Sequence, residues 1–126
     1  MGICKADCIW VDGEKMTPLD VSENAVKKSC HDLLKKIPCA YGIRTNSGKG
    51  AKINGRYIEL AERGTSDEVW CINGKFVAIE FKRMKGGKHG DYQKKFQEKI
   101  ESCGGVYLLC NTAAPLRLFL QEDGLL

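Results

Sequence analysis

The chain has no long apolar run. None of its 126 residues belongs to a stretch that approaches the roughly 18 consecutive apolar residues of a membrane-spanning helix. The first eight residues also lack the apolar segment of a signal peptide. No internal repeat or low-complexity segment divides the sequence, and its length is typical of one domain with its own core. We therefore expect a single domain over residues 1–126 that is cytoplasmic and has no membrane partner.

Two common ligand-binding patterns are also missing. Residues 47–50 resemble part of a phosphate-binding loop, but the Gly-x4-Gly-Lys-Ser/Thr spacing is absent, so we expect no nucleotide cofactor. Cys4 and Cys8 have no second Cys/His pair at zinc-finger spacing, which argues against a zinc site. The 7 cysteines are odd in number and scattered, which favours free thiols in a reducing compartment.

Positive charge is in modest excess, with a formal net charge of +4, but it is unevenly distributed. One basic cluster comprises Lys82, Arg83, Lys85, Lys88 and His89. Such a cluster suits a polyanion such as nucleic acid, and a solvated Lys-rich loop is the alternative. Arg44, Asn46 and Lys49 form a second polar stretch that could contact a nucleic-acid backbone or be a solvated turn.

The most informative stretch surrounds Asn73-Gly74, which separates two runs rich in β-forming residues. This pair predicts a two-residue hairpin, because a type I′ turn needs positive φ at both central residues. The resulting register places Asp67 opposite Glu80, with Lys82 on the same face as Glu80. Two facing carboxylates destabilise a hairpin unless a cation lies between them. The stretch therefore predicts a divalent-metal site beside an ammonium group.

The remaining pattern predicts alternating helices and strands. The first helix should cover residues 20–37, with Asp20 as N-cap and Glu23 completing a capping box. Further expected elements are strands at 39–46, 75–83 and 106–110, a helix at 92–102 capped by Asp91, and a helix from Thr112 to about residue 121. Strand 75–83 is apolar on both faces, so helices should cover the sheet on both sides. Strand 106–110 should pair parallel to it, because a helix joins the two.

Two titratable side chains of the first helix have open roles. Glu23 lies at the edge of the apolar stripe, where it could cap the helix, bring a third carboxylate to the metal, or do both. His31 points away from the stripe on a helical wheel, so we expect it at the surface or its boundary.

Several short motifs occur in a characteristic order along the chain. They are residues 44–48, Gly64-Thr65-Ser66-Asp67, Gly74-Lys75-Phe76, Ile79-Glu80-Phe81-Lys82, Gln93 and Gly104-Gly105. In this order the chain resembles the VRR-NUC family of the PD-(D/E)xK, or restriction-endonuclease-like, nuclease superfamily. Ser66 stands where the superfamily name has proline, which leaves the carboxylate in place. The resemblance covers about residues 20–111 and implies an α/β fold, a central mixed β-sheet flanked by helices in αβββαβ order.

The resemblance also implies an activity, that of a metal-dependent DNA endonuclease. Ligands for one or two Mg²⁺ or Mn²⁺ ions would be Asp67, Glu80, the main-chain carbonyl of Phe81 and Glu23. Lys82 would position or activate the attacking water and stabilise charge on the scissile phosphate. Gln93 would orient the site or the substrate.

Small stand-alone members of this family resemble Holliday-junction resolvases, are often phage-encoded and are expected to be homodimers. The resemblance therefore implies branched DNA as the partner of a homodimer in a bacterial cytoplasm. The residues that would contact DNA are Arg44, Asn46, Lys49, Arg83, Lys85 and Lys88. Three alternatives stay open: a catalytically idle DNA-binding module of the same fold, a flap or single-strand nuclease, and a subunit whose basic loop binds an acidic protein.

Overall fold

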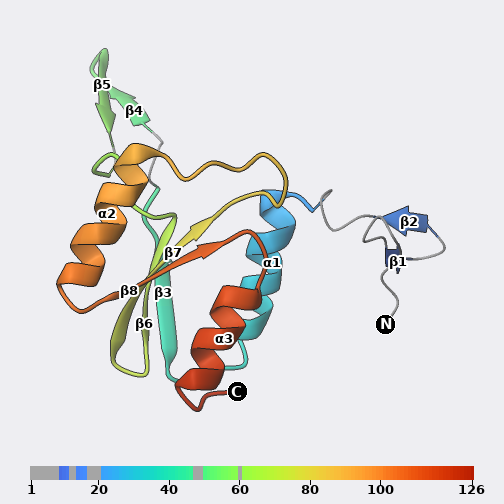
Figure 1. Ribbon diagram of the computed structural model, residues 1–126. Coiled ribbons are helices and arrows are strands. Elements are labelled where there is room, and N and C mark those ends of the chain that lie inside the picture. The colour runs from blue at the N-terminus through green and yellow to red at the C-terminus, as the bar shows by residue number, and fades with distance from the viewer. Residues whose placement is uncertain (1–8, 12–13, 17–20, 47–49, 60) are drawn as a thin grey trace.

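The computed structural model describes residues 9–11, 14–16, 21–46, 50–59 and 61–126 (Figure 1). Its helices are α1 (Glu23–Leu34), α2 (Asp91–Ser102) and α3 (Ala114–Glu122). Its strands are β1 (Ile9–Val11), β2 (Glu14–Met16), β3 (Ala40–Arg44), β4 (Gly50–Ile53), β5 (Arg56–Glu59), β6 (Glu68–Ile72), β7 (Lys75–Phe81) and β8 (Val106–Cys110). The predictions made for Cys4, Cys8, Asp20 and Lys49 fall outside the described residues.

The chain folds as an α/β protein around a mixed four-stranded sheet in the order β3-β6-β7-β8. The first three strands are antiparallel neighbours, and β7 and β8 are parallel, as predicted from the helix between them. Figure 1 shows α2 on one face of the sheet and α1 and α3 on the other. Residues 77–81 of β7 are accordingly buried. No helix in the described part of the chain is long and apolar enough to cross a membrane.

The β6–β7 hairpin has the predicted turn and register. Asn73 and Gly74 have φ values of 52° and 81°, which allow the two-residue turn. The ladder runs from the Ile72–Lys75 pair at the turn to the Glu68–Ile79 pair at the open end. The two strands therefore meet in the alignment that brings residue 67 to residue 80.

The N-cap of α1 lies two positions later than expected, and the N-cap of α2 lies one position earlier. Helix α1 begins after Ser22, whose hydroxyl oxygen accepts a hydrogen bond from the Ala25 N–H at 3.1 Å. Glu23 is thus at the first helical position and not at the third, where a capping box requires it. Helix α2 has Gly90 as N-cap, and Asp91 is its first helical residue. Adjacent polar residues can all act as caps, and local backbone geometry chooses between them.

The core lies between α1, α3 and the sheet. The predicted apolar stripe is buried throughout, and its members are Val26, Cys30, Leu33, Leu34 and Ile37. It packs with Ile79 and Phe81 of β7 and with Leu116 and Leu120 of α3 in one cluster. This packing fixes α1 and the open end of the hairpin in one rigid body.

Trp70 packs against β3 at a position where only glycine fits. A Cβ atom on Gly42, the cross-strand partner of Trp70, would lie 2.1 Å from the indole Cδ2 atom. We expect Gly42→Ala to lower the free energy of unfolding by about 1–3 kcal/mol, since the ring must move to admit a methyl group. Urea unfolding measures the loss. Ile43→Ala, at the next and exposed position, serves as the control and should change stability by less than about 0.5 kcal/mol; equal losses would contradict this packing.

Candidate active site

Asp67 lies at the open end of the hairpin and reaches across to β7. Its Oδ2 atom accepts a hydrogen bond from the backbone N–H of Phe81 at 2.8 Å. Its own carbonyl oxygen accepts from the Thr45 N–H at 3.0 Å, just after the end of β3. Asp67 is therefore held from both neighbouring strands, with its carboxylate directed at the strand that carries Glu80.

Glu80 is a buried carboxylate, with 4% of its surface exposed. Its Oε2 atom accepts a hydrogen bond from Gln93 Nε2 at 3.0 Å and lies 3.5 Å from Lys82 Nζ. Its Oε1 atom is buried and has no hydrogen-bond partner among the described residues. Burial, followed by the negative charge of Asp67, raises the pKa of Glu80 to about 7, although Lys82 opposes the shift. The structure thus keeps this carboxylate in an environment that disfavours its charge.

Lys82 follows β7 directly, and its backbone is still part of the sheet. The Lys82 N–H donates to the Cys110 carbonyl at 2.9 Å, which continues the β7–β8 pairing by one residue. Only 18% of its side chain is exposed. The ammonium group therefore lies beside Glu80, as the strand alternation predicts, and the backbone that carries it is held in the sheet.

Gln93 in the first turn of α2 is held at both ends of its amide. Its Oε1 atom accepts from the Gly90 N–H at 2.9 Å, while its Nε2 atom donates to Glu80. Gly64, with φ of 88°, lets the segment before Asp67 approach this turn, since a Cβ there would lie 2.3 Å from the Tyr92 carbonyl oxygen. Glu80 is therefore held by its own strand in the hairpin and by the hydrogen bond from Gln93 of α2.

His89 and Tyr107 border the site and were not predicted from the sequence. His89 Nε2 lies 3.3 Å from the Tyr107 hydroxyl oxygen. Burial, and then the negative charges of Glu80 and Asp67, raise the pKa of Tyr107 above its usual range. Burial, and then the positive charges of Lys94 and Lys82, lower the pKa of His89. The parallel pairing of β7 and β8 could have placed Tyr107 here, because it pairs with Ala78, two residues before Glu80.

The donor set suits a hard divalent cation in part. Asp67 and Glu80 supply carboxylate oxygens, and the buried Glu80 Oε1 atom is a group that a cation would satisfy. No group of three or more His, Cys, Asp or Glu side chains in the described ranges could hold a metal ion. Glu23 is exposed at the start of α1, so the structure does not bring it into such a group with Asp67 and Glu80. The role of the Phe81 carbonyl stays a prediction.

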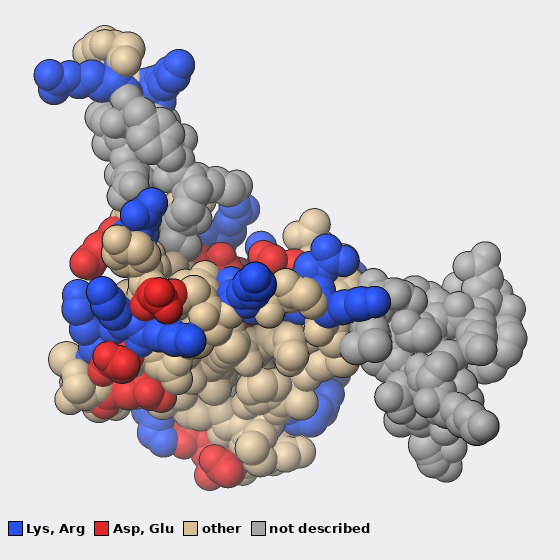
Figure 2. All heavy atoms as spheres, turned by 45° about the horizontal axis from the view of Figure 1, so that its top comes forward, with Lys and Arg blue, Asp and Glu red and all other residues tan. Residues whose placement is uncertain are grey.

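The predicted DNA-contacting residues that the structure describes lie on two segments of the chain. Arg83, Lys85 and Lys88 are exposed on the loop between β7 and α2. Figure 2 shows Lys and Arg side chains distributed over one face of the molecule, with Asp and Glu between them. Arg44 ends β3 opposite Glu68, and Asn46 is exposed with φ of 59°. The basic loop and the end of β3 thus each present exposed side chains that can donate hydrogen bonds.

No protein-family model, curated protein or solved structure matches this chain. A function therefore has to be inferred from the geometry of Asp67, Glu80, Lys82 and Gln93.

Proposed function

We propose that this protein is an endonuclease that hydrolyses phosphodiester bonds in DNA with Mg²⁺ or Mn²⁺, built on a restriction-endonuclease-like core. The observation that carries the proposal is the buried Glu80 carboxylate, which has one oxygen without a donor and lies between Asp67 and the Lys82 ammonium. Two neighbouring carboxylates in a buried place cost stability, so a purely structural hairpin gains nothing from them. A strongly perturbed carboxylate beside a fixed lysine is typical of an active site.

The ion would be held by Asp67 and Glu80, with the Phe81 carbonyl as a further oxygen ligand. When bound, a divalent cation makes water a stronger nucleophile at neutral pH and offsets charge on the phosphate. Lys82 can donate a hydrogen bond to the attacking water or to a phosphate oxygen, where negative charge develops. Gln93 keeps one Glu80 oxygen directed at α2, which leaves the other for the ion.

The shape of the substrate belongs to the same proposal. We expect branched DNA, in particular a four-way junction, to be cleaved by a homodimer, as the family resemblance implies. Exposed donors on the basic loop suit phosphates, because sequence-independent DNA binding needs positive charge and hydrogen-bond donors alone.

A cleavage panel tests the proposal. Four-way junction, flap, splayed duplex, linear duplex and single-stranded DNA are incubated with Mg²⁺, Mn²⁺ or EDTA, and light scattering gives the mass in parallel. We expect cleavage of a branched form with either metal, no product in EDTA, and the mass of a dimer. Binding without product from any form would instead indicate an idle DNA-binding module. Salt-sensitive binding to an acidic protein, without affinity for DNA, would indicate a subunit-interaction protein.

Gln93 gives a prediction that separates positioning from folding. We expect Gln93→Ala to slow cleavage about tenfold with little change in DNA affinity, because Glu80 loses the donor that orients it. Gln97→Ala, one turn further along α2, is the matched control, since the Gln97 amide donates a hydrogen bond to Glu101 at 3.5 Å and not to Glu80. Single-turnover rates of the two variants measure the difference, and similar rates would remove the positioning role.

A further inference from the structure

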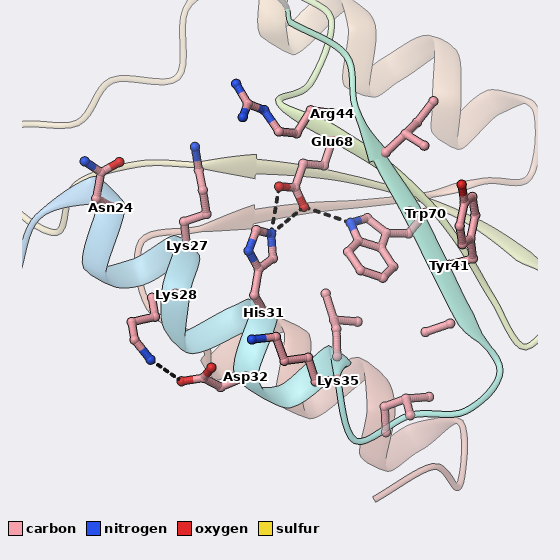
Figure 3. A pocket seen from close by; sticks show the side chains of 15 residues that line it. Asn24, Lys27, Lys28, His31, Asp32, Lys35, Tyr41, Arg44, Glu68 and Trp70 are labelled. Atoms are coloured by element: carbon pink, nitrogen blue, oxygen red, sulfur yellow. Dashed lines mark hydrogen bonds and ion pairs between the residues drawn. The ribbon is translucent and has the colours of Figure 1, made fainter.

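A hollow of about 650 Å³ lies between α1 and the β3–β6 edge of the sheet (Figure 3). It is on the sheet face opposite Glu80, because Glu68 lines it and pairs with Ile79, and side chains alternate along a strand. Its wall combines apolar side chains with His31, Glu68 and Trp70. The hollow is therefore separate from the proposed metal site.

The aromatic wall of the hollow is fixed in orientation. Glu68 is 2% exposed, and its Oε1 atom accepts a hydrogen bond from Trp70 Nε1 at 2.8 Å. His31 Nε2 lies 2.9 Å and 2.7 Å from the two Glu68 carboxylate oxygens. Figure 3 shows the three side chains joined in this way, with the indole ring beside the hollow. Gly42 leaves room for the ring to lie against β3, so the ring is set as a preformed flat surface.

The rim of the hollow is positively charged. Lys27, Lys28, Lys35 and Arg44 line it, against the carboxylates of Asp32 and Glu68. Asp32 is paired with Lys28 at 3.0 Å, and Glu68 is occupied by His31 and Trp70. Among the described residues, Lys27, Lys35 and Arg44 form no ion pair. The rim thus offers three cations around one aromatic surface.

We infer that this hollow binds an unpaired base of a DNA strand, stacked on Trp70, with the adjoining phosphates at Lys27, Lys35 and Arg44. Every base has a π-face that stacks on an aromatic side chain, and lysine and arginine complement the phosphates. A paired base is already stacked on both sides within its duplex, so only unpaired DNA can use the indole. The inference rests on the proposed function, and supplies a reason for selectivity toward DNA with unpaired segments.

The hollow lies within reach of the proposed reaction site. Glu68, which lines the hollow, directly follows Asp67 in the sequence. Phe81 directly follows Glu80, and its ring is 5.9 Å from the His31 ring. Arg44 adjoins Thr45, whose N–H holds the Asp67 carbonyl. A strand that leaves Asp67 over the end of β3 therefore meets Arg44 first and the indole next.

Fluorescence of the full chain tests the base site without cleavage. The sequence has 2 tryptophans, so Trp10→Phe leaves Trp70 as the reporter. We expect a thymidine hexanucleotide in EDTA to quench Trp70 emission saturably. An abasic oligonucleotide of equal length should bind about tenfold more weakly and should leave the emission unchanged. Equal affinities without quenching would overturn the inference and would mean that only phosphates are recognised.

Two neighbouring lysines provide the matched variants. Lys35 lines the hollow and Lys36 does not, while both are exposed and follow α1. We expect Lys35→Glu to weaken hexanucleotide binding roughly fivefold and Lys36→Glu to change it less than twofold. Equal effects would also overturn the base site. Quenching by the hexanucleotide with no cleavage in the metal panel would remove the nuclease proposal alone, whereas cleavage without quenching would remove the base site alone.

Discussion

Lys82→Ala is expected to lower the rate of DNA cleavage by about 100- to 1000-fold, the usual loss when one charge-stabilising donor is removed from an active site. The Lys82 ammonium is 3.5 Å from the Glu80 carboxylate, and a water molecule in its place would carry no positive charge. DNA binding and Mn²⁺ binding should change by about twofold or less, because the proposed metal ligands and the basic residues of the loop are retained. Single-turnover cleavage, calorimetry with Mn²⁺ and a DNA-binding titration measure the three quantities.

A matched control for Lys82 exists on the same loop. Lys85 is exposed and carries the same charge, so Lys85→Ala removes equal charge without touching Glu80. We expect a modest loss of DNA affinity and an almost unchanged rate at saturating DNA. Full activity of Lys82→Ala, or losses of similar size in both variants, would exclude the proposed role of Lys82.

Glu80→Gln is expected to abolish cleavage and weaken Mn²⁺ binding at least tenfold, yet to stabilise the metal-free protein above neutral pH. The reason is the raised pKa of Glu80, about 7 against an ordinary value of 4.5, which arises from burial and then from Asp67. Because the folded state binds a proton at Glu80 more tightly than the unfolded state does, protonation of Glu80 stabilises the fold. Stability of the metal-free wild type should fall by about 3 kcal/mol as the pH rises from about 4.5 through the folded-state pKa to about 8, and this contribution should change little above that.

Urea unfolding in EDTA at pH 5 and pH 8 measures this effect. The difference between wild type and Glu80→Gln isolates the contribution of Glu80, because the other titrating groups are common to both proteins. Glu98→Gln, at an exposed position of α2, should leave the difference between the two pH values unchanged. A Glu80→Gln variant that is less stable than wild type at pH 8 would show that the Glu80 charge is compensated within the protein.

The hairpin could be predicted from the sequence because its information is local. Asn73 and Gly74 determine the turn, the turn determines the register, and the register brings Asp67 to the strand of Glu80. The alternation of β7 then places Lys82 beside Glu80 without reference to any other element. The α/β class and the parallel β7–β8 pair followed equally from short-range patterns.

Features that depend on distant contacts could not be predicted in the same way. His31 was expected at the surface or its boundary, but nothing in its surroundings in the sequence indicates a partner 37 residues away, Glu68. The cap of α1 was misassigned because Asp20 and Ser22 both have a capping side chain, and the choice depends on backbone angles.

The connection between β7 and α2 begins with two residues whose backbone N–H groups are hydrogen-bonded, Lys82 and Met84. The Lys82 N–H is bound to the Cys110 carbonyl, and the Met84 N–H donates to the Val21 carbonyl at 3.3 Å. The Lys82 backbone is therefore held at β8, while Lys85 and Lys88 follow both hydrogen-bonded residues along the chain. The loop also packs on this side chain, since a Cβ atom on Gly87 would lie 2.9 Å from the Lys82 Cβ atom. We therefore expect a rearrangement of the loop to reach the Lys82 side chain, while the Lys82 backbone keeps its place beside β8.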